Sequence, residues 1–80
     1  MKNIIITGAS KGIGRVIAKS LRKKYHIINI DIVENKIDGV DFYKCDLSDK
    51  GQLLKTIEKI KTNIDSLYAL VNNAAMFSKK

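Results

Sequence analysis

The segment Thr7–Gly14 (TGASKGIG) holds three glycines, directly after the apolar run Ile4–Ile6. It precedes a stretch with the helical spacing of Ile13, Val16, Ile17 and Leu21. The start of a helix presents unpaired backbone N–H groups and the positive end of the helix dipole, which together attract phosphate. Glycines permit a tight turn and let a phosphate approach the backbone. The segment therefore predicts a phosphate-binding turn, with Lys11 and Arg15 adding positive charge.

The glycine spacing separates this turn from two other phosphate motifs. It lacks the Gly-Lys-Ser/Thr of a P-loop, and it is not G-x-G-x-x-G. Glycine also makes ordinary strand-to-helix turns, so a second signal is needed. Asp31 supplies it, because it follows the apolar segment Ile27–Ile30 and lies 17 residues after Gly14. A carboxylate at that place can accept hydrogen bonds from both hydroxyls of an adenosine ribose.

Apolar patterning predicts the elements that position these groups. Strands are expected at Lys2–Thr7, Ile27–Ile30, Val40–Cys45 and Leu67–Val71. One helix is expected from Gly12 to about Lys23–Lys24. A second follows a cap at Ser48 or Asp49, and its apolar face is formed by Leu53, Ile57, Ile60 and Ile64. Both apolar helix stripes are expected to lie in the core.

Strands that alternate with helices indicate an α/β fold with a parallel sheet and two main helices. The carboxyl ends of parallel strands meet at one edge, so residues following the strands should lie together. One connection is unusual. The link from Asp31 to Val40 is short for a parallel crossover, so a compact loop or a single helical turn must make it.

Four segments carry a resemblance to the short-chain dehydrogenase/reductase family. Residues 7–14 are similar to its T-G-x-x-x-G-x-G cofactor motif, and Asp31 matches its acidic residue after the second strand. Asp46 resembles the family's aspartate that accepts a hydrogen bond from the adenine amino group. Leu47 resembles the apolar residue after it, which packs against the adenine ring. Residues 72–75 (NNAA) resemble its N-N-A-G motif, with Ala75 in place of glycine.

The resemblance implies that residues 1–80 form the N-terminal, dinucleotide-binding half of a truncated Rossmann domain. It implies a partial doubly wound sheet with four strands in the order 3-2-1-4. The implied cofactor-binding residues are Gly8, Ser10, Lys11, Gly12, Ile13, Gly14, Asp31, Asp46, Leu47, Asn72 and Ala74. We expect NAD(H) in preference to NADP(H), because the charge of Asp31 repels a 2′-phosphate. Lys11 is the contrary feature, since a basic residue there often accompanies NADP(H).

Family enzymes transfer hydride with a serine and a Tyr-x-x-x-Lys pair, in which the tyrosine is the acid/base. The three tyrosines of this chain are followed, four positions on, by Asn29, Leu47 and Asn72. We therefore assign no catalytic residue and expect no hydride transfer between NAD(H) and an alcohol or carbonyl from this chain alone. A fourth strand without a further neighbour would leave an unpaired edge, which predicts self-association and low stability.

Composition leaves two other classes of function open. The net charge of +7 allows a non-catalytic basic module that binds nucleic acid or an acidic partner, although the basic residues are scattered and lack interleaved aromatic residues. A truncated product with no independent role is the other alternative. The single cysteine, Cys45, and lone His26 predict neither a disulfide nor a metal site. No apolar run approaches the length of a membrane helix, and a cytoplasmic protein is expected.

Overall fold

The computed structural model describes residues 1–34 and 36–73. The elements follow the chain as β1 (Asn3–Thr7), α1 (Gly12–Leu21), β2 (His26–Asp31), β3 (Val40–Lys44), α2 (Lys50–Asn63) and β4 (Ala69–Asn72). All strand pairs are parallel, in the order β3-β2-β1-β4. The predicted α/β class, doubly wound strand order and two helices are confirmed. The observed ends of the elements differ from the predicted ends by a few residues. For example, β4 begins at Ala69 and was predicted to begin at Leu67.

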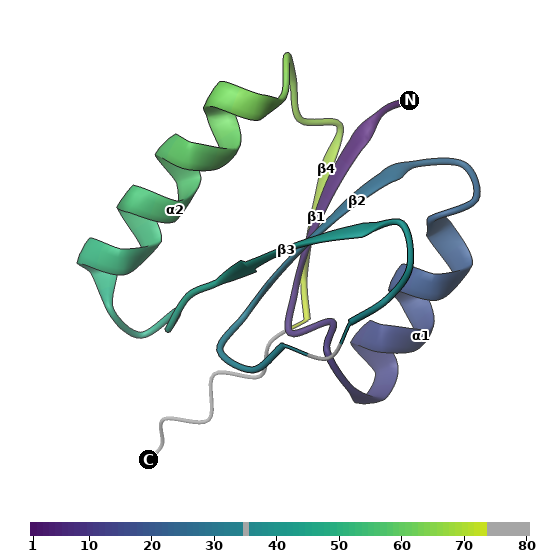
Figure 1. Ribbon diagram of the computed structural model, residues 1–80, viewed down its shortest axis with the longest axis horizontal. Coiled ribbons are helices and arrows are strands. Elements are labelled where there is room, and N and C mark those ends of the chain that lie inside the picture. The colour runs from purple at the N-terminus through teal and green to yellow at the C-terminus, as the bar shows by residue number, and fades with distance from the viewer. Residues whose placement is uncertain (35, 74–80) are drawn as a thin grey trace.

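The two helices lie on opposite sides of the sheet, so the described chain has three layers (Figure 1). Alternate residues of the central strands serve the two sides. Ile4, Ile6 and Ile27 belong to the core under α1, whereas Ile5 and Ile28 belong to the core under α2. Burial on both faces explains why the middle of β1 is a continuous apolar run and why β2 is apolar from Ile27 to Ile30 except at Asn29.

Small residues bring α1 close to the sheet. Gly14 and Ala18 are its buried residues, while Ile17 packs against the core from a partly buried position. The predicted apolar stripe is wrong for Ile13 and Val16, which are 75% and 63% exposed. The reason is that the helix rests on its smallest side chains, which turns these larger neighbours away from the sheet.

α2 makes fewer contacts with the strands of the sheet than α1 does. Thr56 and Ile60 are its buried residues, with Leu53 and Ile64 partly buried against the second core. Ile57, predicted to lie in the core, is 37% exposed, so that part of the prediction is wrong. Ile57 instead lines a groove between α2 and β4. The described residues do not fill this groove, so part of the apolar face of α2 is exposed there.

The short connection from β2 to β3 contains no helix among its described residues. Side chains from the glycine turn, from α1 and from the residue at the C-cap of α1 donate hydrogen bonds to backbone carbonyls of this connection. Ser10 Oγ donates to Val33 O, Arg15 Nη2 donates to Lys36 O at 3.3 Å, and Arg22 Nη1 donates to Asp38 O at 2.7 Å. Ile37 is buried in the core on the α1 side. These contacts replace the helix that normally accompanies a parallel crossover.

His26 links three neighbouring strands at the end of the sheet where the strands begin. Its Nδ1 lies 2.6 Å from Asn3 Oδ1 on β1, and its Nε2 lies 2.7 Å from Asp41 Oδ2 on β3. Tyr25 and Tyr68 stack at the same edge with ring centroids 5.8 Å apart. His26 therefore has a structural role, and these two tyrosines lie at the opposite end of the strands from the glycine turn.

Candidate functional site

The glycine turn joins the carboxyl end of β1 to the start of α1. Gly8 and Gly12 have φ values of 70° and 64°, a left-handed conformation that favours glycine. Gly8 N donates to Ile30 O at 2.9 Å, which ties the turn to β2. A Cβ atom added to Gly12 would meet nothing within 4 Å, so open space lies beside the first turn of α1.

Gly14 is required for a different reason, because it allows a close approach. A Cβ atom there would collide with Asn73 Nδ2 and would lie 2.5 Å from Gly8 O. Asn73 Nδ2 donates to Gly8 O at 3.0 Å, and Thr7 Oγ1 donates to Asn72 Oδ1 at 3.1 Å. The last residue of β4 and the residue after it therefore hold the end of β1 and the glycine turn from the side opposite β2.

The N-terminus of α1 lacks a side-chain cap. Its N-cap residue is Lys11, which makes no capping hydrogen bond with its side chain. The N–H groups of the first turn are thus presented at the glycine turn together with the positive end of the dipole. Arg15, predicted to add positive charge near the turn, donates to the carbonyl of Lys36 in the β2–β3 connection.

Asp31 lies in a pocket of about 260 Å³ beside this helix start. The pocket is lined by Ser10, Lys11, Asp31, Ile32, Val33 and Glu34. Asp31 Oδ2 accepts from Ser10 N at 3.2 Å and Oδ1 accepts from Ile32 N at 2.7 Å. A carboxylate has about four acceptor sites, so each oxygen has a lone pair beyond these bonds. The fixed carboxylate is suited to accept from two neighbouring hydroxyls.

Asn29 is a site residue that sequence analysis missed. Its side chain is buried, and it contacts the turn at Ala9 and Ser10. The available signal was an amide side chain inside the apolar strand Ile27–Ile30, because a buried amide needs partners. Ser10, which the sequence predicts as a cofactor contact, lines the Asp31 pocket, and its hydroxyl donates to Val33 O.

Asp46 and Leu47 lie outside the Asp31 pocket. Asp46 Oδ1 accepts from Ser48 Oγ at 2.6 Å and from Ser48 N at 3.0 Å, which lowers the pKa of Asp46 below its usual value. Leu47 packs on the core under α2 and lines the groove beside β4. Of the other predicted contacts, Ile13 is exposed beside the turn, and Ala74 lies outside the described residues.

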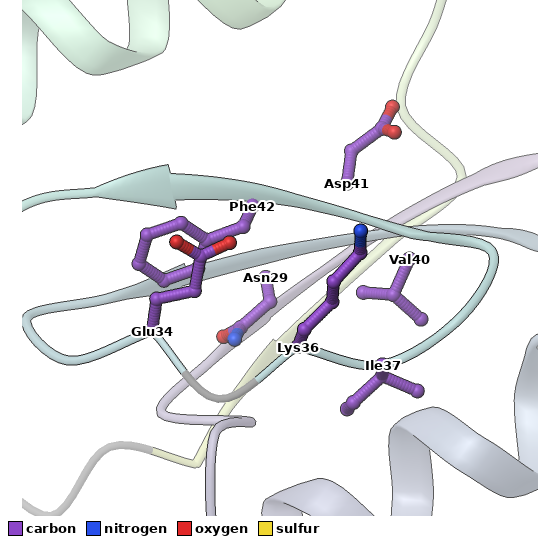
Figure 2. A pocket seen from close by; sticks show the side chains of 7 residues that line it. All are labelled: Asn29, Glu34, Lys36, Ile37, Val40, Asp41 and Phe42. Carbon is purple, nitrogen blue, oxygen red and sulfur yellow. The ribbon is translucent and has the colours of Figure 1, made fainter.

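Two other hollows border the site. The groove between α2 and β4 measures about 370 Å³, and the side chains of Thr7 and Asn72 form part of its lining. A smaller pocket of about 200 Å³ lies along β3 and the connection that precedes it (Figure 2). In Figure 2, Ile37 and Val40 point toward α1, while Asp41 points to the other side of β3. Glu34 lines both this pocket and the one that holds Asp31.

The described residues contain no cluster of three or more histidine, cysteine or acidic side chains that could hold a metal ion. Within the same part of the chain, neither helix is long and apolar enough to cross a membrane.

Comparisons with known proteins agree with this geometry. Residues 2–80 match the model of the short chain dehydrogenase family. The sequence is 30% identical over 88 residues to a 3-oxoacyl-(acyl-carrier-protein) reductase of Staphylococcus aureus, covering 94% of this chain and 36% of that protein. The chain spans 24% to 36% of the length of the first curated relatives that it matches.

Two solved structures share the fold. One is a C-terminal deletion mutant of the aldohexose dehydrogenase of Thermoplasma acidophilum, with a TM-score of 0.85 and 36% identity over 94% of this chain and 33% of that chain. The other is a 4-hydroxyisoleucine dehydrogenase complexed with NADH, with a TM-score of 0.81 and 30% identity over 95% of this chain and 35% of that chain.

Proposed function

Because this chain belongs to the short-chain dehydrogenase family, we propose that it forms the adenosine and pyrophosphate half of a nicotinamide-dinucleotide site. The observation that carries this proposal is the convergence of three features at one sheet edge: the glycine turn, the uncapped start of α1 and the fixed carboxylate of Asp31. The open space beside Gly12 fits an approaching pyrophosphate, which would accept hydrogen bonds from the first N–H groups of α1. Residues 1–80 are then one half of a Rossmann domain.

NAD(H) is the dinucleotide that we propose. Asp31 and Glu34 line the same pocket, and two carboxylates there oppose a 2′-phosphate. Lys11 lines the pocket as well and attracts anions, so its charge partly offsets theirs. The similar 4-hydroxyisoleucine dehydrogenase was solved with NADH.

The remaining contacts complete the proposed half-site. Both hydrogen bonds from Ser48 go to Asp46 Oδ1, and Oδ2 is the atom that we assign to the adenine amino group. Leu47 would pack against the adenine ring. Ile13 and Asn72 would line the cofactor, and Ala74 is proposed from the sequence motif alone.

In the whole protein, the bound dinucleotide would supply or accept the hydride, with an alcohol or carbonyl compound as substrate. We assign to the described residues only binding and orientation of its adenosine half. This chain alone is proposed to give no turnover. We also propose a cytoplasmic location, which the buried free thiol of Cys45 supports.

Self-association through β4 is a further part of the proposal. Among the described residues β4 pairs with β1 only, and Tyr68 and Leu70 on or beside this strand are more than half exposed. An exposed edge strand can pair with another chain. Sedimentation of the purified chain should show concentration-dependent dimers or larger species, and Leu70→Lys should reduce them. A monomer at every concentration contradicts this part.

Calorimetric titration with NAD and NADP tests the central proposal. The chain should bind NAD more tightly than NADP, and Asp31→Ala should lose NAD binding. Asp65→Ala, which removes an equal charge from an exposed position away from the site, is the matched control. A folded chain that binds neither dinucleotide contradicts the proposal. Steeply salt-dependent binding of a polyanion, unaffected by Asp31→Ala, would favour a basic binding module instead.

A further inference from the structure

A series of hydrogen bonds connects the glycine turn to Asn29 on β2 and to Val33 in the segment that follows β2. Ala9 N donates to Asn29 Oδ1 at 2.9 Å, and Asn29 Nδ2 donates to Ser10 Oγ at 3.0 Å. Ser10 Oγ then donates to Val33 O. Asn29 and Ser10 are only 3% and 2% exposed, so water does not compete with these bonds.

The residue types fix the direction of this chain of bonds. Asn29 Oδ1 faces a backbone N–H, so the amide can adopt only one orientation and its Nδ2 must donate to Ser10. A serine hydroxyl has a single proton. Because Ser10 Oγ accepts from Asn29, that proton is directed to the carbonyl of Val33.

Ser10 therefore holds the segment after β2 at two points. Its backbone N–H binds the carboxylate of Asp31, and its hydroxyl binds the carbonyl of Val33. Apolar packing does little here, because the side chains of Ile32 and Val33 are both more than half exposed. The hydrogen bonds from Ser10 thus fix the wall of the pocket that also includes Glu34.

We infer that Asn29 is a positioning residue that shapes this pocket through Ser10, and that the pair sets the preference for a ribose with a free 2′-hydroxyl. The inference rests on the proposed dinucleotide site. The Asn29–Ser10–Val33 connection keeps the two carboxylates of the pocket in place. When it is broken, Glu34 moves away from the ribose and a 2′-phosphate is excluded less strongly.

Asn29→Asp tests the direction of the bonds. The new carboxylate keeps an acceptor for Ala9 N but has no donor for Ser10, so the hydroxyl proton of Ser10 turns to that carboxylate and releases Val33. Ser10→Ala removes the same bond without adding a charge, which covers failure of the first variant to fold. Both variants should bind NAD about tenfold more weakly and discriminate less against NADP.

Arg22→Ala is the matched control. It removes a side-chain bond to another carbonyl of the same connection, that of Asp38, away from the pocket. It should lower stability and leave the ratio of the NAD and NADP dissociation constants unchanged. Ser10→Thr, which retains a hydroxyl, should restore much of the ratio. Folded Asn29→Asp and Ser10→Ala variants with the wild-type ratio would overturn the inference.

Backbone ¹⁵N relaxation without cofactor separates this inference from the proposed function. Residues 31–34 should become more mobile in Ser10→Ala than in the wild-type chain or in Arg22→Ala. An unchanged segment overturns the positioning role whether or not a dinucleotide binds. A wild-type chain that binds neither dinucleotide overturns the proposed function and the ribose preference together, while the relaxation data still decide the positioning role.

Discussion

The two helices of this protein begin differently. α1 follows the glycine turn and has Lys11 at its N-cap, and the side chain of Lys11 makes no capping hydrogen bond. α2 is closed by Asp49, whose Oδ1 accepts from Gln52 N at 3.2 Å, while Gln52 Oε1 accepts from Asp46 N. The N-cap side chain of α2 therefore accepts a hydrogen bond from one of the first N–H groups of that helix. The first N–H groups of α1 are presented instead at the sheet edge where Asp31 lies.

The helices also differ in how they cover the sheet. The α1 side has small residues at the contact, and side chains of the turn and helix hold the neighbouring connection at Val33, Lys36 and Asp38. The α2 side has a longer helix with two buried residues and an apolar groove beside it. The glycine turn thus leads into the helix that approaches the sheet through its smallest residues.

Truncation of a core isoleucine on each side should show the largest difference. Ile27→Ala should lower the free energy of unfolding by about 4 kcal/mol and Ile60→Ala by about 2 kcal/mol. Ile60 lies one helical turn from Ile57, which lines the groove, so its surroundings can relax around the lost atoms. Both side chains are 2% exposed or less, so burial itself is matched. Urea denaturation measures both values, and equal losses would contradict the proposed difference in packing.

Adding a methyl group at one glycine of each helix should have the next largest effect. Gly14→Ala should destabilise the chain by about 1–3 kcal/mol, because its Cβ would collide with Asn73 and Gly8. Gly51→Ala is the control, since the nearest atom to its Cβ is Asp49 Oδ1 at 3.4 Å. Urea denaturation should show no loss for Gly51→Ala. A Gly14→Ala variant with wild-type stability would mean that α1 is less tightly seated than described.

The two N-cap residues should separate stability from binding. Asp49→Ala should cost about 1 kcal/mol of stability, because it removes a side-chain cap. Lys11→Ala should change stability by a few tenths of a kcal/mol at most, since Lys11 makes no capping bond. Thermal unfolding and NAD titration of both variants check this, and only Lys11→Ala should weaken binding. A large loss of stability in Lys11→Ala would show that the start of α1 is not open.

The smallest expected effect concerns pH at the start of α2. Hydrogen bonds from Ser48 lower the pKa of Asp46, so their contribution to stability is present above the unfolded pKa and is lost as the pH falls through the folded pKa. In Ser48→Ala the pKa of Asp46 should rise toward its usual value. NMR titration of the Asp46 carboxyl carbon measures this shift. An unchanged titration would assign the lowered pKa to another cause.

Periodicity and strand-end residues were enough to predict the parallel sheet, the two helices and the edge at which Gly8, Asp31 and Asn72 gather. The strand order was predicted only from the resemblance to the short-chain dehydrogenase/reductase family. They were not enough to predict which helix residues are buried. Ile13 and Val16 have the spacing of a core stripe, but α1 rests on Gly14 and Ala18 because small residues allow a closer approach. The role of Asn29 depends on Ala9 and Ser10, which lie about 20 residues away in the sequence.

By itself, the sequence determined the parallel α/β sheet and the glycine turn, because continuous apolar runs, helical spacing and glycine conformations are local properties of the chain. Only the tertiary structure decided which hydrogen bonds hold the short β2–β3 connection and which group accepts the hydrogen bond from the hydroxyl of Ser10. Those features depend on hydrogen bonds between residues distant in sequence, whose geometry exists only once α1 and β2 are packed together.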